Sequence, residues 1–301
     1  MSKSNSKTKY ILNYPFKDYT EHEGINNSSF QSIDPDRDGC PAIWHANQIN
    51  KPTETSSPAL FFGKVFHKYI LEMDDFFNDY TVLDAKKKQE IYYKALDSGS
   101  KAKGFSKSLG SYKDEVARLK RIGMEFIEPE LVDTLGEMRT SVSKQIEPYD
   151  DVILGTDRIT ELSVFAELYD FQGRPALCKG RIDAYKKNKK IVDLKTTVSA
   201  SPNHLARHIP KMKLYVQAAF YMDLMKANGE NVEEFWWCFV DKRAPYPVSY
   251  IQCEEGMLNL GRHEYRTWLG WINDGRETDN WSGHLNLIDW PDYFIKQIDM
   301  L

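Results

Sequence analysis

This 301-residue chain has few cysteines and no long apolar run. It also has no excess of positive charge, because its net charge is −4. The cysteines show no CxxC pair or close cluster, which argues against a zinc site and a disulfide framework; they are Cys40, Cys178, Cys238 and Cys253. The polar first residues lack the apolar core of a secretion signal, and no apolar run approaches membrane-spanning length. We therefore expect a cytoplasmic protein without membrane contacts.

A predicted β-hairpin brings two aspartates together. Two short apolar runs within residues 180–197 flank a lysine-rich turn, and a hairpin centred on Asn188 sets Asp183 opposite Asp193. Like charges that face each other across strands are destabilising. A divalent cation held between them would remove the repulsion, because hard oxygen ligands suit magnesium or manganese.

The same alternation places a lysine beside the aspartates. Lys195 follows Asp193 by two residues and therefore shares its face, while Val192 and Leu194 point into a core. Two carboxylates and an ammonium group are thus predicted to converge. A solvated hairpin whose charges merely face water would show the same spacing.

A second segment, from Lys211 to Met225, is predicted to be a helix with Pro210 at its start and Gly229 beyond its end. Its apolar face carries the amide of Gln217, and Tyr221 follows at helical spacing. A buried amide of this kind is more often a satisfied core group than a functional one.

A third segment supplies a histidine. Residues 60–72 have the pattern of an amphipathic helix, in which His67 shares one face with Gly63, Phe66 and Ile70. A single histidine on such a face is more often a core residue than a ligand.

Four motifs occur along the chain in a fixed order: Gly63-x-x-x-His67-x-x-x-Leu71-Glu72, Gly180-Arg181-x-Asp183, Asp193-x-Lys195-Thr196-Thr197 and Gln217-x-x-x-Tyr221. Together they resemble the nuclease domain of exodeoxyribonuclease VIII, the RecE-type exonucleases of phage recombination, within the PD-(D/E)XK nuclease superfamily. The resemblance covers roughly residues 25–270. It implies a metal-dependent 5′-to-3′ exonuclease that degrades linear double-stranded DNA and leaves single-stranded 3′ tails.

The resemblance also implies ligands for a metal. Hydrolysis of a phosphodiester needs a nucleophilic hydroxide and neutralisation of charge in the transition state, both of which magnesium can supply. Asp183 and Asp193 would be carboxylate ligands, the Leu194 carbonyl would add a backbone oxygen, and His67 would be a further ligand. An imidazole is a softer ligand than magnesium prefers, so manganese also fits.

Further site residues follow from the same resemblance. Lys195 would orient or deprotonate the attacking water, and Gln217 and Tyr221 would position that water, the lysine or the 5′ end of the strand. Glu161 resembles the acidic residue that precedes the first aspartate of the family. Glu167 is the alternative, and either glutamate could be an exposed strand charge.

A basic stretch indicates where DNA would bind. From Lys86 to Arg121 the chain is rich in lysine and arginine with few acids, and residues 98–107 have the glycine and serine content of a mobile loop. A local basic stripe can bind phosphates whatever the overall charge. We expect DNA contacts at Lys101, Lys103, Lys107 and Arg181, although lysines on a solvated helical hairpin would give the same pattern.

The coarse organisation is that of an α/β protein with a central mixed β-sheet flanked by helices, the PD-(D/E)XK core. We expect a flexible lead over residues 1–24, a single exonuclease domain over 25–275 and an aromatic tail over 276–301. Helices are predicted at about 86–96, 112–138 and 256–273, and a strand pair at 235–240 and 248–253.

Two other functions stay open. The chain could be a PD-(D/E)XK endonuclease, or a non-catalytic DNA-binding or assembly protein that keeps the fold. The scattered cysteines exclude the iron–sulfur cluster of Cas4-like relatives. By resemblance the partners would be double-stranded DNA ends, further copies of the chain in a closed homo-oligomer, and a single-strand annealing recombinase.

Overall fold

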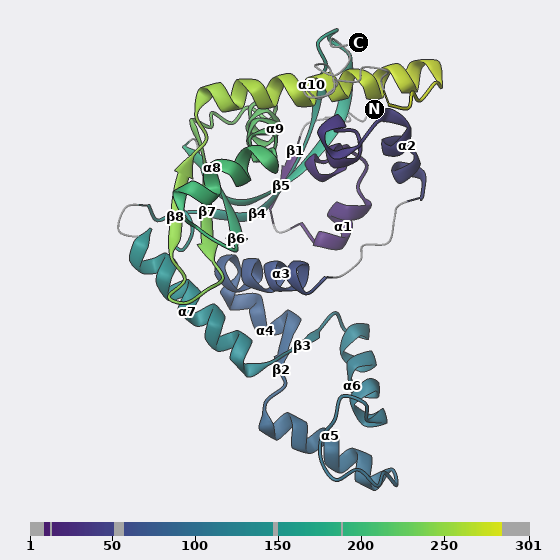
Figure 1. The fold of residues 1–301 in the computed structure, drawn as a ribbon, viewed down its shortest axis with the longest axis vertical. Coiled ribbons are helices and arrows are strands. Elements are labelled where there is room, and N and C mark those ends of the chain that lie inside the picture. The colour runs from purple at the N-terminus through teal and green to yellow at the C-terminus, as the bar shows by residue number, and fades with distance from the viewer. Residues whose placement is uncertain (1–8, 13, 51–56, 147–149, 188, 285–301) are drawn as a thin grey trace, which may run out of the picture.

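A six-stranded sheet forms the centre of the molecule, in the order β1-β4-β5-β6-β7-β8 (Figure 1). The strands are β1 (Lys9–Ile11), β4 (Ile159–Tyr169), β5 (Pro175–Lys186), β6 (Lys190–Thr197), β7 (Glu234–Asp241) and β8 (Val248–Gln252). Among the described strands of this sheet only β6 and β7 pair in parallel, so the sheet is mixed, as expected. The structure is a computed structural model that describes residues 9–12, 14–50, 57–146, 150–187 and 189–284.

Helices cover both faces of this sheet. One face packs against α8 (Pro202–Lys211), α9 (Leu214–Ala227) and α10 (Glu255–Thr278), and the other against α3 (Pro58–Leu71) and α7 (Pro129–Gln145). Strand β7 shows why two cores form, since Trp237 belongs to the first and Cys238 to the second. Near-continuous apolar strands are expected where both faces are buried. The α/β fold class is therefore confirmed.

The expected flexible lead is packed onto the body wherever the structure describes it. Strand β1 pairs with β4, and α1 (Phe16–Glu21) lies over β5. The buried ammonium of Lys179 donates hydrogen bonds to the carbonyls of Tyr19 (2.9 Å), Thr20 (3.1 Å) and His22 (2.6 Å). These contacts hold a segment whose polar sequence gave no helix or strand signal.

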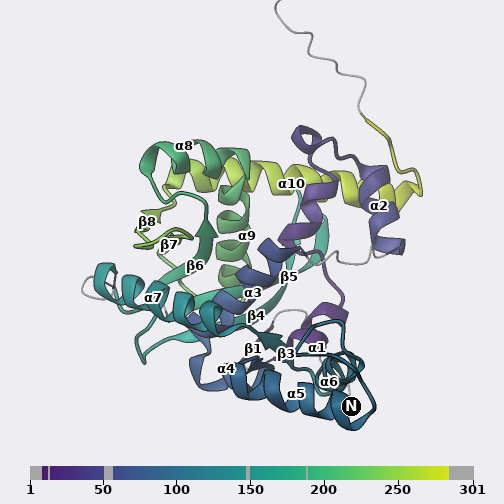
Figure 2. The same cartoon turned by 60° about the horizontal axis from the view of Figure 1, so that its bottom comes forward.

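An arm projects from the body beyond α3 and α7 (Figures 1 and 2). Its base is the parallel pair β2 (Tyr80–Val82) and β3 (Glu125–Ile127), preceded by α4 (Phe76–Asp79), and it carries α5 (Ala85–Asp97) and α6 (Gly110–Arg121). We call residues 85–124 the basic arm. The single helix expected at 112–138 is wrong, because the chain turns at Gly123, whose φ of +77° suits glycine, and enters β3 before α7.

Other expectations differ in detail. Pro210 lies in the last turn of α8 instead of starting α9, and Lys213, in the left-handed conformation, separates the two helices. The centre of the predicted hairpin, Asn188, and most of the predicted aromatic tail lie outside the described residues. α2 (Pro41–Asn50) contacts Trp281 of the described part of that tail, whose ring stacks on His45 at 4.0 Å. Among the described helices none has the length and apolarity to cross a bilayer.

Candidate metal-binding active site

Strands β5 and β6 separate at the two predicted aspartates. Their paired register ends at Ala184 opposite Val192. Beyond that point the backbone amide of Leu194 donates to the Asp183 carboxylate at 2.8 Å. The sheet therefore opens where Asp183 and Asp193 face each other, as the hairpin predicted.

Three elements bring potential metal ligands to this opening. His67 comes from α3, Glu161 from β4 and Asp183 from β5, and one ligand atom from each lies within 4.8 Å of the others. The His67 Nδ1 atom is 3.5 Å from Asp183 Oδ2. Of the two glutamates considered, Glu161 belongs to this cluster. This set of three is the group that the described residues offer for a metal.

Glu161 has an unusual backbone. Its φ of +51° interrupts the β4–β5 ladder, because Thr160 and Leu162 pair with β5 while Glu161 itself does not. A left-handed conformation is uncommon for a residue with a side chain, and such strain gathers at functional sites. The interruption lies directly across from Asp183.

Asp193 and Lys195 form the second half of the site. The Lys195 ammonium lies 2.7 Å from an Asp193 carboxylate oxygen, and Asp193 is only 2% exposed. Burial alone would lower the pKa of Lys195, but the Asp193 and Asp183 carboxylates outweigh it and raise that pKa. Lys195 is therefore a cation at neutral pH. The Leu194 side chain lies in the core, and a role for its carbonyl stays a prediction.

The carboxylates of the site lie close together and are buried. Burial raises the pKa of Asp183 well above its usual range, and the neighbouring Asp193 adds to the effect. Burial, and then Asp183, likewise raise the pKa of Glu161, while Arg181 opposes the change. Burial lowers the pKa of His67, which keeps its imidazole neutral and able to ligate. Crowded carboxylates beside a neutral imidazole fit a divalent cation such as magnesium or manganese.

Helix α9 closes the site from the other face of the sheet. Gly180 of β5 permits this approach, since an added Cβ would lie 2.9 Å from the Tyr221 ring and from Leu224. Burial raises the pKa of the Tyr221 hydroxyl well above the usual value, and the neighbouring Gln217 side chain opposes this effect. The predicted Gln217 and Tyr221 thus lie together on α9, within electrostatic reach of both aspartates.

Arg181 is engaged inside the site. Its Nε atom donates to Glu161 at 2.5 Å, and its Nη1 atom donates to the Tyr14 carbonyl at 2.9 Å. The exposed ring of Phe16 lies 5.5 Å from the guanidinium. Sequence reasoning expected Arg181 to contact DNA and missed these partners, because α1 has no sequence signal that places it over β5.

The predicted DNA-binding lysines lie on the basic arm. Lys101 and Lys103 are exposed and form no ion pair with any other described residue. Lys107 differs, because its ammonium lies 2.7 Å from Glu128. Among the described residues, Lys107 therefore already has an acidic partner, whereas Lys101 and Lys103 do not.

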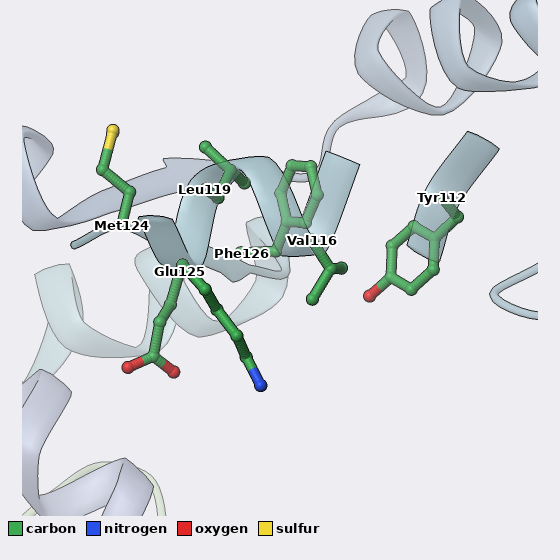
Figure 3. Close-up of a pocket in the computed structure, with 7 residues that line it drawn as sticks. Tyr112, Val116, Leu119, Met124, Glu125 and Phe126 are labelled. Carbon is green, nitrogen blue, oxygen red and sulfur yellow. The ribbon is translucent and has the colours of Figure 1, made fainter. Parts of the chain in front are cut away.

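The arm also has an open hollow of about 160 Å³ between α6 and β3 (Figure 3). Its lining is mostly apolar and consists of Tyr112, Val116, Leu119, Lys120, Met124, Glu125 and Phe126. It carries one carboxylate and no imidazole, so it does not resemble a second catalytic centre.

A forked mixed sheet with carboxylates and a lysine at the fork defines the PD-(D/E)XK class of nuclease folds. The chain belongs to the family described as "PDDEXK-like domain of unknown function (DUF3799)", whose model matches residues 27–290. No curated protein matches it.

Two solved structures give comparisons of unequal weight. A proposed exonuclease from Eubacterium rectale is similar, with a TM-score of 0.58 at 15% identity, over 95% of this chain and 98% of that one. This likeness concerns the fold alone. The structure of SSO0001 has a TM-score of 0.26 at 17% identity, over 60% of this chain and 85% of that one, and carries no argument.

Proposed function

We propose that the protein is a Mg²⁺-dependent exonuclease that degrades linear double-stranded DNA in the 5′-to-3′ direction and leaves 3′ tails for phage-type homologous recombination. The observation that carries the proposal is the convergence of His67, Glu161 and Asp183 within 4.8 Å beside the Asp193–Lys195 pair. Mn²⁺ would also fit the imidazole. The similar solved structure is named a proposed exonuclease, and the choice of an exonuclease over an endonuclease otherwise rests on the resemblance of the four sequence motifs.

Each residue would have a distinct part in the reaction. Asp183 and Asp193 would hold the metal, with His67 and Glu161 completing its protein ligands. The bound metal would supply an activated water and neutralise charge on the phosphate. Lys195, kept charged by its carboxylate neighbours, would orient that water by charge and hydrogen bonding.

Arg181 would change partners when the site is loaded. Its hydrogen bond now occupies the Glu161 carboxylate, which a metal would also use. If Glu161 served as a metal ligand, it would hold the Arg181 guanidinium less tightly, and Arg181 would be available as a donor to a phosphate. Arginine suits phosphate oxygens because its donors form a planar fork. This exchange would reconcile the predicted DNA contact of Arg181 with its observed place.

The deciding experiment compares linear and closed circular duplex DNA of one sequence with Mg²⁺. The wild-type protein should degrade the linear form, spare the circle and release label first from 5′ ends. Asp193→Ala is the inactive control. Cutting of the circle at a comparable rate would replace the exonuclease with the endonuclease alternative, and inactivity on both forms would reject a DNA nuclease. A closed homo-oligomer and an annealing recombinase as partners stay predictions.

A further inference from the structure

A long segment beside the active site contains no acidic residue. The chain averages roughly one aspartate or glutamate in seven residues, yet none occurs between Asp193 and Asp223. This segment covers the end of β6, all of α8 and most of α9. The charged side chains of this segment are therefore all basic, although the chain as a whole is negative.

Helix α8 concentrates these cations on one face. The positions i, i+3, i+4 and i+7 form a single stripe on a helix. On α8 that stripe consists of His204, Arg207, His208 and Lys211. Leu205 and Ile209 are the buried residues of the helix, while His204 and His208 are half-buried and Arg207 and Lys211 are exposed.

This stripe adjoins the catalytic lysine. The His208 ring lies 6.3 Å from that of Phe239, which is the register partner of Lys195 in the β6–β7 pair. The His204 and His208 rings stack with centroids 5.3 Å apart. Burial, His204 and Lys195 lower the pKa of His208, so at neutral pH its imidazole is an uncharged hydrogen-bonding group.

The two charged members of the stripe have no acidic partner. Arg207 and Lys211 are exposed and form no ion pair within the described ranges. Lys213, only two residues further on, has a side chain that is 12% exposed and contacts three carboxylates: Asp34 (2.8 Å), Asp36 (2.7 Å) and Glu264 (3.1 Å). The fold therefore neutralises Lys213 and leaves the α8 cations available for an anion.

We propose that α8 binds the sugar-phosphate backbone of the DNA strand held at the metal site, with His208 nearest the scissile phosphate and Arg207 and Lys211 on flanking phosphates. The inference rests on the proposed nuclease function and adds a phosphate-binding surface separate from the basic arm. Unpaired cations on one face beside the catalytic residues complement a chain of phosphates. A surface so close to Lys195 would position the strand for reaction as well as bind it.

Duplex binding in EDTA, measured over a range of salt concentrations, tests the contact. The double variant Arg207→Gln/Lys211→Gln should lower the slope of log K against log salt by about two, because each phosphate contact contributes about 0.9. Its matched control is Lys144→Gln/Lys226→Gln, which removes two exposed charges from the last turns of α7 and α9 and should leave the slope unchanged. Arg207→Lys/Lys211→Arg should retain the wild-type slope and so show that charge is what matters.

The rate of cleavage tests whether α8 contacts the DNA close to the scissile phosphate. A neutral methylphosphonate next to the scissile phosphate should slow the wild type about tenfold. It should slow the α8 double variant much less, since the contact is already lost. Saturating DNA should not restore the rate of this variant.

The outcomes separate the two proposals. A wild type that binds and cuts DNA, with an unchanged salt slope in the α8 variant, would overturn the α8 inference alone. The α8 inference would also be overturned if the methylphosphonate slowed the α8 double variant by the same factor as the wild type. A wild type that neither binds nor cuts duplex DNA would overturn the proposed function and the α8 surface with it.

Discussion

The active site and the basic arm handle charge in opposite ways. The site buries its charges beside one another, as Asp193 and its partner Lys195 show. The arm, residues 85–124, carries eleven lysines and arginines and four acids, which leaves 29 basic and 40 acidic residues elsewhere out of totals of 40 and 44. Positive charge is thus segregated on a projection and negative charge on the body. In the proposed function the buried charges act on the chemistry and the exposed charges capture the DNA, and each assignment can be tested.

The largest effect is expected at Asp193. Asp193→Ala removes a carboxylate from the metal site and should lower the rate on linear duplex by about 10³-fold or more, the scale of losing one preorganised charge. Circular dichroism should show an intact fold. A well-folded variant with substantial Mg²⁺-dependent activity would contradict the assignment.

Lys195 gives a smaller and more discriminating effect. Because its carboxylate neighbours raise its pKa and keep it charged, Lys195→Arg should retain turnover within about tenfold. Lys195→Gln, which removes the charge, is the matched comparison and should lose far more. A loss of about 10²-fold or more in the arginine variant would instead indicate proton transfer by Lys195.

Asp183 should show that the site is built for function at the expense of stability. Because folding raises the pKa of the Asp183 carboxyl, the unfolded chain releases this proton at a lower pH than the folded protein does. The metal-free protein should therefore lose stability as the pH rises from about 4 towards the raised pKa. At pH 8 in EDTA, Asp183→Asn should be more stable than the wild type by about 1–2 kcal/mol.

Thermal unfolding with EDTA and with Mg²⁺ measures this prediction. Mg²⁺ should stabilise the wild type and leave Asp183→Asn nearly unchanged, because the variant has lost a ligand. Asp97→Asn, at an exposed position on α5, is the control and should shift neither curve. A wild type more stable than Asp183→Asn in EDTA would show that the buried carboxylate is not under strain.

The smallest effect belongs to the arm. Replacing Lys101, Lys103 and Lys107 with glutamine should weaken binding to every sequence a few-fold and flatten its salt dependence. Lys107→Gln alone should contribute least, because Glu128 already holds that ammonium. Saturating DNA should restore the rate, unlike in the α8 variant. An unchanged salt slope would mean that these lysines are only a solvated surface.

Local sequence was enough to predict how one half of the candidate site is arranged. The alternation around the hairpin sets Asp183 opposite Asp193 and places Lys195 on the same face, because register follows from a short turn. The helix that carries His67 and the mixed sheet were also correct. The ends of the helices were predicted less accurately, because Gly123 and Lys213 introduce turns that the apolar pattern does not show.

The other half depended on contacts between distant segments. Periodicity could place His67 on a helix face and Glu161 on a strand, but only the packing of α3 and β4 against β5 brings them to Asp183. The Glu161–Arg181 hydrogen bond and the docking of α1 on Lys179 are likewise tertiary. Family resemblance supplied what local reasoning could not.

The parallel pairing of β2 with β3 joins the basic arm to the body at one place. Tyr80 and Glu125 are register partners, so the chain leaves towards α5 and returns from α6 at neighbouring strands. A segment that leaves and rejoins the body at one short strand pair can be lengthened or shortened with little disturbance to the rest of the fold, because insertions at exposed sites are tolerated. If the arm binds DNA as proposed, its hold on the substrate could be engineered separately from the proposed catalytic site.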